Sequence, residues 1–97
     1  MNKPAKEMFK ELGYKLDYEG DTLIEYRKYF YKDTDYSNTD GFAVASFDLT
    51  DKEYFVEYFD SNEDNYVVAV SVDLHKAIVQ QVKELGWLWV NQFIKKY

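Results

Sequence analysis

The stretch DLHKAIVQQVKELG, residues 73–86, decides the fold, because its own chemistry predicts a helix with defined ends. Asp73 is a capping residue type that accepts hydrogen bonds from the free amides of a first turn. Gly86 favours the left-handed conformation that ends a last turn. The apolar side chains recur at helical spacing and form one stripe, made of Leu74, Ile78, Val82 and Leu85. Such a stripe must cover another layer, and the aromatic-rich segments before it are the candidate.

A second, shorter helix is predicted near the start of the chain. Pro4 suits a first helical turn, where its missing amide costs nothing, and Gly13 ends the pattern. At about nine residues this helix is too short to be stable alone, so it must dock on other elements. Its apolar stripe is made of Ala5, Met8, Phe9 and Leu12.

Strand and turn signals fill the segment between the two helices. Gly20-Asp21 and Thr50-Asp51 are turn dipeptides between alternating or apolar runs, so each predicts a hairpin. The predicted strands are 14–19, 23–30, 42–49, 53–59 and 66–72, with loops at 32–41 and 60–65.

The order of these elements predicts the fold class. Because no helix separates the strands, the sheet should be antiparallel. We expect a single α+β domain over residues 1–97, with a two-layer architecture and the order α-β-β-β-β-β-α. The antiparallel sheet should have four to five strands, and the N- and C-terminal helices should pack on one face.

The second sheet face and the tail are the candidate interaction surfaces. Phe55 and Phe59 should face away from Tyr54, Val56 and Tyr58, so both faces of the sheet carry apolar surface. The tail, the protein's own second copy or a ligand could cover the second face. The tail WLWVNQFIKKY, residues 87–97, predicts a short helix that either packs back on the domain or binds a partner. Its candidate partner surface is Trp87, Trp89, Phe93 and Tyr97.

Composition excludes several function classes. The chain has no cysteine, which excludes disulfides, thiolate zinc sites and a cysteine nucleophile. The net charge is −6, and residues 17–73 hold 15 acidic and four basic groups, which opposes binding to a nucleic-acid backbone. No apolar run is long enough for a signal peptide or a membrane span. We therefore expect a cytoplasmic protein that binds neither membrane nor nucleic acid directly.

Known catalytic and ligand-binding patterns do not match. Two acidic loops, starting at Asp33 and Asp60, resemble helix-loop-helix calcium sites, but Asn38 and Asn65 stand where glycine is required. His75 is the only histidine, and the four glycines are isolated, so no phosphate-binding loop is present. We predict no catalytic residue, no metal and no cofactor.

The tyrosine-rich strands also raise the alternative of a platform that stacks bases. Tyr26, Tyr54, Tyr58 and Tyr66 would supply the rings. Such platforms need a basic groove, whereas Glu25, Glu53 and Glu57 lie on the same strands. Core packing, with the hydroxyls reaching solvent, is the better interpretation of most tyrosines.

The sequences at the ends of the two predicted helices resemble those of a group of known proteins. The segment AKEMFKELGY, residues 5–14, and the later ELGW, residues 84–87, resemble a group of small uncharacterised proteins of Gram-positive bacteria and their prophages. That group has no established function, so the resemblance implies no activity. This chain differs in continuing ten residues past Gly86-Trp87.

These observations together predict a non-catalytic accessory protein, related to prophages, that binds another protein. The alternative is an acidic nucleic-acid mimic that inhibits a DNA-binding enzyme as an anti-defence protein. A monomer is favoured over a homodimer, because the acidic groups between residues 48 and 64 would have to be kept clear of an apolar interface.

Overall fold

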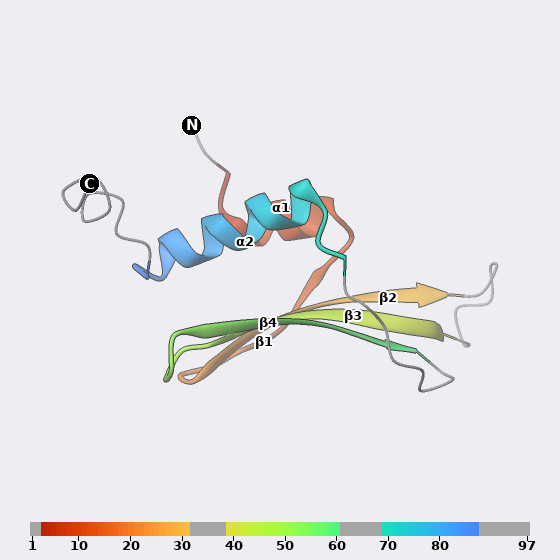
Figure 1. Cartoon of the computed structure of the whole chain (residues 1–97), viewed down its shortest axis with the longest axis horizontal. Helices are drawn as coiled ribbons and strands as arrows, with labels where there is room; N and C mark the ends of the chain where they lie inside the picture. Colours follow the sequence, from red (N-terminus) through yellow and green to blue (C-terminus); the bar gives the residue numbers. More distant parts are fainter. Residues whose placement is uncertain (1–2, 32–38, 61–68, 88–97) are drawn as a thin grey trace.

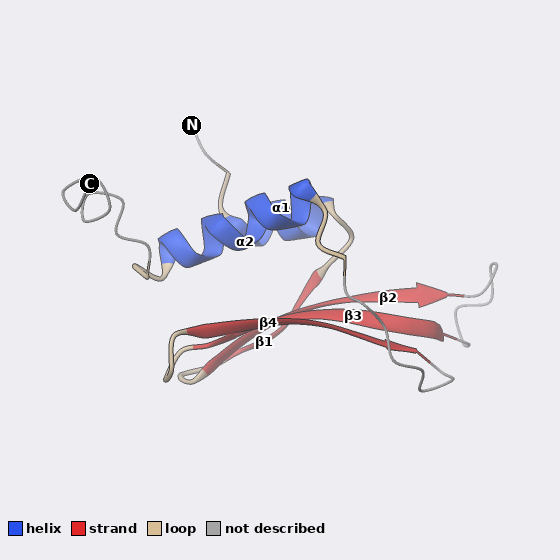
Figure 2. Ribbon diagram, in the orientation of Figure 1, coloured by secondary structure: helices blue, strands red, loops and turns tan. Residues whose placement is uncertain are grey.

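The computed structural model describes residues 3–31, 39–60 and 69–87, which form two layers (Figure 1). The helices α1 (Ala5–Glu11) and α2 (Val72–Glu84) pack against each other in one layer. The other layer is an antiparallel sheet in the order β1-β2-β3-β4, with both helices on the same side of it (Figure 2). Its strands are β1 (Lys15–Glu19), β2 (Leu23–Tyr31), β3 (Thr39–Asp48) and β4 (Glu53–Asp60). The predicted α+β class and both predicted hairpins are therefore confirmed.

Each helix is followed by a leucine, a glycine and an aromatic residue, and both ends have the conformation that this pattern predicts. The two sequences are Leu12-Gly13-Tyr14 and Leu85-Gly86-Trp87. Gly13 and Gly86 have left-handed φ values of 92° and 76°, and the amides of each glycine and of the next residue donate back into the last turn. After α1, the Tyr14 amide donates to the Phe9 carbonyl at 2.9 Å, and the two rings meet edge to face with centroids 5.7 Å apart. A local sequence signature thus defines both helix ends.

The start of α2 differs from the prediction. The sequence predicts Asp73 as the cap, but Ser71 has this role, because its hydroxyl oxygen accepts a hydrogen bond from the Leu74 amide at 3.0 Å. Asp73 lies in the first turn instead, where the positive end of the helix dipole stabilises its carboxylate. The helix consequently begins at Val72.

The predicted fifth strand at 66–72 is wrong in its C-terminal part. Residues 69–71 have no strand conformation, and residues 66–68 lie outside the described residues. Val70 and Val72 are 45% and 70% exposed, so a strand here would bury little apolar surface. The hydrogen bond of the Ser71 cap therefore favours the start of the helix over a strand. The predicted loop at 32–41 is also shorter than expected at its end, since β3 already begins at Thr39.

The core lies between the helices and the sheet and is centred on Phe9. This ring is fully buried, stacks on Tyr26 with centroids 3.9 Å apart, and meets Phe47 edge to face at 6.2 Å. The small buried residues Ala43 and Ala45 of β3 leave room for these rings. Both predicted helix stripes are confirmed, because all their members are buried or packed against this core.

Neither described helix could serve as a membrane span. The helix α1 has seven residues and α2 has 13, and both are too short and too polar to cross a bilayer.

Candidate functional site

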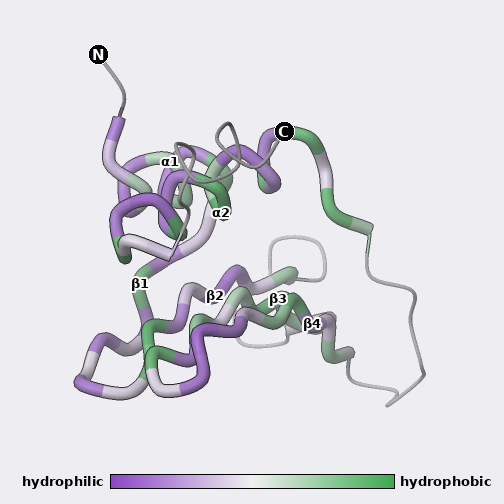
Figure 3. The backbone as a smooth tube through the Cα atoms, turned by 60° about the vertical axis from the view of Figure 1, so that its left-hand side comes forward, coloured by the Kyte–Doolittle hydropathy of each residue, from purple (hydrophilic) through white to green (hydrophobic). Residues whose placement is uncertain are grey.

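Hydrophilic and hydrophobic residues alternate along parts of the strands (Figure 3). Because successive side chains of a strand point to opposite sides, the sheet has two different faces. Tyr26, Ala45 and Phe47 belong to the face that packs under α1 and α2. Residues of the other parity point away from both helices, and none of the described helices lies over them (Figure 2). We call this side the helix-free face; its members are Lys15, Tyr18, Leu23, Glu25, Arg27, Tyr29, Phe42, Val44, Ser46, Asp48, Glu53, Phe55, Glu57 and Phe59, and the Asp17 carboxylate lies beside Arg27 on the same side.

Strand register arranges the helix-free face in rows that run across the strands, and three of these rows hold its aromatic rings, Lys15 and Glu57. A β-bulge between Leu16 and Tyr18 keeps both Lys15 and Tyr18 on this face although three positions separate them. Aromatic residues fall in the two outer rows, whereas the middle row carries charged groups at both of its ends. These three rows are Tyr18-Glu25-Ser46-Phe55, Lys15-Arg27-Val44-Glu57 and Tyr29-Phe42-Phe59, and a fourth row beside the hairpin turns is Leu23-Asp48-Glu53.

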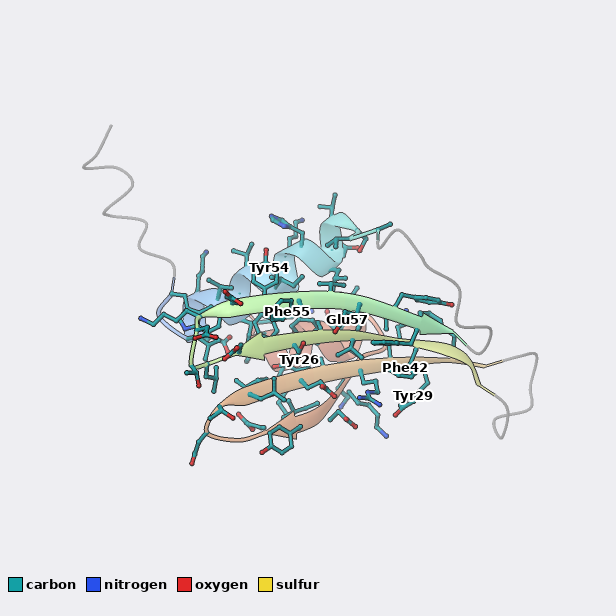
Figure 4. All side chains as sticks on the ribbon, turned by 60° about the horizontal axis from the view of Figure 1, so that its bottom comes forward. Tyr26, Tyr29, Phe42, Tyr54, Phe55 and Glu57 are labelled. Carbon is teal, nitrogen blue, oxygen red and sulfur yellow. The ribbon has the colours of Figure 1, made fainter. Side chains whose placement is uncertain are left out.

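Large aromatic side chains are exposed on the helix-free face. Phe55 and Phe59 of the edge strand β4 are 48% and 44% exposed, and Tyr18 of the opposite edge strand β1 is 52% exposed. Phe42 stacks on Phe59 with ring centroids 5.0 Å apart, and Figure 4 shows Phe42 and Tyr29 together at one end of the sheet. Exposed apolar clusters with polar neighbours are typical of interaction surfaces.

Arg27 lies in the middle row and is held by its neighbours. Its Nη2 donates to Glu25 Oε1 at 2.8 Å, its Nε lies 3.7 Å from Asp17 Oδ2, and its guanidinium carbon lies 4.5 Å from the Phe42 ring centroid. The hydrogen bond to the Tyr29 hydroxyl, followed by the pairing with Glu25, raises the pKa of Arg27. The guanidinium is thus fixed against a ring with its charge compensated, which suits a contact surface better than an anion site.

The two ends of the middle row carry opposite charges that are not compensated in this way. Lys15 on β1 and Glu57 on β4 are exposed, and neither forms an ion pair within residues 3–31, 39–60 and 69–87. Glu57 lies directly beside the buried Val44, near the middle of β4 (Figure 4). The helix-free face therefore has a positive edge and a negative edge at the same height along the strands.

A groove between the two helices is a weaker candidate. It has a volume of about 520 Å³ and is lined by charged residues of both signs. Lys3 and Glu11 on its wall pair with each other, and Asp73 lies near Lys76 in sequence on the opposite wall. Because Lys3 and Glu11 pair with each other, the wall that they form offers little field to bind an ion.

An acidic cluster at the β3–β4 turn has a structural role. The carboxylates of Asp48, Asp51 and Glu53 lie within 4.8 Å of one another. Asp48 Oδ1, however, accepts hydrogen bonds from the amides of Thr50 at 3.0 Å and Asp51 at 3.2 Å, which shapes the turn. Exposed carboxylates at such a turn need no metal to explain them.

One buried polar pair crosses the core. The Tyr26 hydroxyl donates to Gln81 Oε1 at 2.5 Å, which satisfies the one buried polar side chain of α2. Burial, followed by the nearby carboxylates of Glu84 and Glu19, raises the pKa of Tyr26 to about 12. The pair ties α2 to β2 and is not accessible to a ligand.

Of the predicted tail surface, the structure describes Trp87 alone. Its ring is half-buried and lies 6.5 Å from the Phe47 ring, so it packs partly on the core. Trp89, Phe93 and Tyr97 lie outside the described residues, and their role as a partner surface stays a prediction.

Sequence reasoning found Phe55 and Phe59 but missed the other members of the helix-free face. Tyr18, Arg27, Tyr29 and Phe42 join them only once the strands are paired. The available signal was the period of two in Glu25-Tyr26-Arg27-Lys28-Tyr29, which places Glu25, Arg27 and Tyr29 opposite to the core residue Tyr26.

Comparison of this chain with protein families, curated proteins and solved structures finds no significant match. The class that the fold and the site define is a small two-layer α+β domain with an aromatic sheet face that neither described helix covers.

Proposed function

We propose that this chain is a small, non-catalytic protein-binding module that docks its partner on the helix-free face. The exposure of aromatic side chains there, from 37% at Tyr29 to 52% at Tyr18, is the observation that supports this function. Aromatic residues and arginine are enriched in the buried centres of protein–protein interfaces. A flat sheet face also suits a flat protein surface, whereas small molecules bind in concave pockets.

The charge pattern of the described residues gives the acidic-mimic alternative less support. A mimic of a nucleic-acid backbone needs carboxylates lined up along one face. On the helix-free face, Asp17 and Glu25 lie against Arg27, and the cluster at the β3–β4 turn is confined to one end of the sheet. The relation to prophages stays a prediction from the resemblance of the helix ends.

Two neighbouring residues of β4 provide a matched test. Phe55 and Tyr54 are both 48% exposed, but Phe55 belongs to the helix-free face and Tyr54 to the helix side. The tagged full chain, Phe55→Asp and Tyr54→Asp are each mixed with an untagged copy of the chain and a lysate of a Gram-positive bacterium. We expect wild type and Tyr54→Asp to retain a protein that Phe55→Asp loses. Equal recovery by both variants would contradict docking on the helix-free face, provided that thermal unfolding shows both to be folded.

A further inference from the structure

We infer that the protein which the helix-free face binds is a second copy of this chain, packed sheet to sheet across a two-fold axis. This inference rests on the proposed function and names its partner. It replaces the monomer favoured from the sequence, because Glu57 of the acidic segment would face Lys15 of the second copy and not an apolar group. It comes from the three rows that hold Tyr18, Lys15 and Tyr29, because in each of them groups on β1 or β2 are complementary to groups on β4 or β3 of a rotated copy.

The two-fold axis of this dimer runs parallel to the strands, and it lies above the helix-free face between β2 and β3. It places β1 of one copy over β4 of the other, and β2 over β3, while each row stays opposite its own equivalent. Closed dimers require such self-complementary patches, in which residue i meets residue j and residue j meets residue i.

The middle row is complementary in charge under this rotation. Lys15 at its β1 end faces Glu57 of the second copy, and Glu57 faces Lys15 in return, which makes two ion pairs in each dimer. These are the two charged groups of the row that form no ion pair in the described chain. Between them, the Arg27 stem faces the buried Val44 of the second copy.

The outer rows are complementary in chemistry. In the outer row on the side of the hairpin turns, Tyr18 faces Phe55 of the second copy. At the other end, Tyr29 faces Phe42. The rings of Tyr18, Tyr29, Phe42 and Phe55 would therefore each be covered by an aromatic ring of the second copy.

The geometry of stacked sheets accommodates these contacts. Face-to-face sheets pack about 10 Å apart and cross at about 30°, which displaces opposed residues on the edge strands by roughly 4 Å. Lysine and glutamate side chains are long enough to span that displacement. A four-stranded face with strands of about eight residues covers on the order of 500 Å² per copy, and about 1,000 Å² in total is the lower end for a specific interface. We therefore expect a reversible dimer.

A charge exchange tests the inference on the full chain. Lys15→Glu places two glutamates opposite each other, and Glu57→Lys places two lysines opposite each other, at two points in each dimer. By sedimentation equilibrium, each single variant should weaken dimerisation about tenfold, since each exposed pair changes from attraction to repulsion. The combined variant Lys15→Glu, Glu57→Lys restores opposite charges and should return dimerisation to near the wild-type value.

Lys6→Glu and Glu7→Lys are the matched controls, because they make the same charge changes at exposed positions of α1 in the helix layer. They should leave dimerisation within about twofold of wild type. A wild-type chain that stays monomeric through 100 µM, an order-of-magnitude ceiling for a weak interface, would overturn the inference, as would single variants that dimerise like wild type. If the wild-type chain does not dimerise but Phe55→Asp still loses a protein of the lysate, the proposed function stands with a different partner. If Phe55→Asp changes neither dimerisation nor the binding of a lysate protein, the inference and the proposed function are both wrong.

Discussion

The buried pair of Tyr26 and Gln81 provides a quantitative test of how the two layers are joined. The residues are 3% and 5% exposed, and the hydroxyl donates to the amide oxygen at 2.5 Å. Tyr26→Phe removes the donor and leaves the Gln81 oxygen buried without its partner. We therefore expect the free energy of unfolding to fall by about 1–3 kcal/mol. Gln81→Leu strands the hydroxyl instead and should cost a similar amount.

The double variant distinguishes a hydrogen bond from simple packing. It replaces both polar groups with apolar ones, so neither is left stranded in the core. Its cost should consequently be smaller than the sum of the two single costs, by about 1 kcal/mol or more. Urea unfolding at pH 7, followed by circular dichroism, measures all four chains. Costs that add within about 0.5 kcal/mol would refute the coupling.

The same pair should make stability depend on alkaline pH. The pKa of Tyr26 is raised to about 12 in the folded chain, mainly by burial, so the folded state holds this proton more tightly than the unfolded state. Its contribution is fully present below pH 10 and is lost as the pH rises from 10 through 12. Tyr26→Phe lacks this contribution, so the stability difference between wild type and variant should shrink in that window. An unchanged difference from pH 9 to 12 would contradict the assignment.

Four further substitutions test the helix layer by chemical denaturation. Ile78→Ala should cost about 2–5 kcal/mol, because Ile78 is 3% exposed in the core, and a cost below about 0.5 kcal/mol would mean that another face of α2 is buried. Ser71→Ala should cost about 1 kcal/mol through loss of the cap, while Asp73→Ala should cost less; the reverse order would restore Asp73 as the cap. Gly86→Ala should cost about 1 kcal/mol from its left-handed φ alone, since the added methyl group meets no atom within 4 Å, and a neutral result would contradict the C-cap.

Local chemistry made the helices predictable. The Leu-Gly-aromatic ends and the apolar stripes depend on residues within a few positions of each other, and the structure confirms them at Gly13 and Gly86. The start of α2 was predictable in type but not in position, because Ser71 and Asp73 are both good capping residues. The choice depends on where the preceding segment enters the helix, which no local pattern specifies.

The helix-free face was predictable only in part, because its composition depends on strand pairing. Alternation placed Phe55 and Phe59 on the face opposite to Tyr54, and the structure confirms it. The bulge at Asp17, which brings Tyr18 onto the same face, and the long-range bond from Tyr26 to Gln81 follow from contacts between distant segments. A sequence pattern of period two gives the parity of a residue, but not its neighbours on the next strand.

The most direct test of the account is a nuclear Overhauser measurement between Tyr18 and Phe55. Within one copy these residues lie on the two edge strands, three strand spacings or roughly 14 Å apart, which is too far for a direct signal. In a sample that mixes isotope-labelled and unlabelled full chains, the two-fold dimer should give intermolecular signals between the Tyr18 ring of one copy and the Phe55 ring of the other. A dimer whose intermolecular signals come only from residues outside the helix-free face, or a chain that gives no such signals at millimolar concentration, would contradict it.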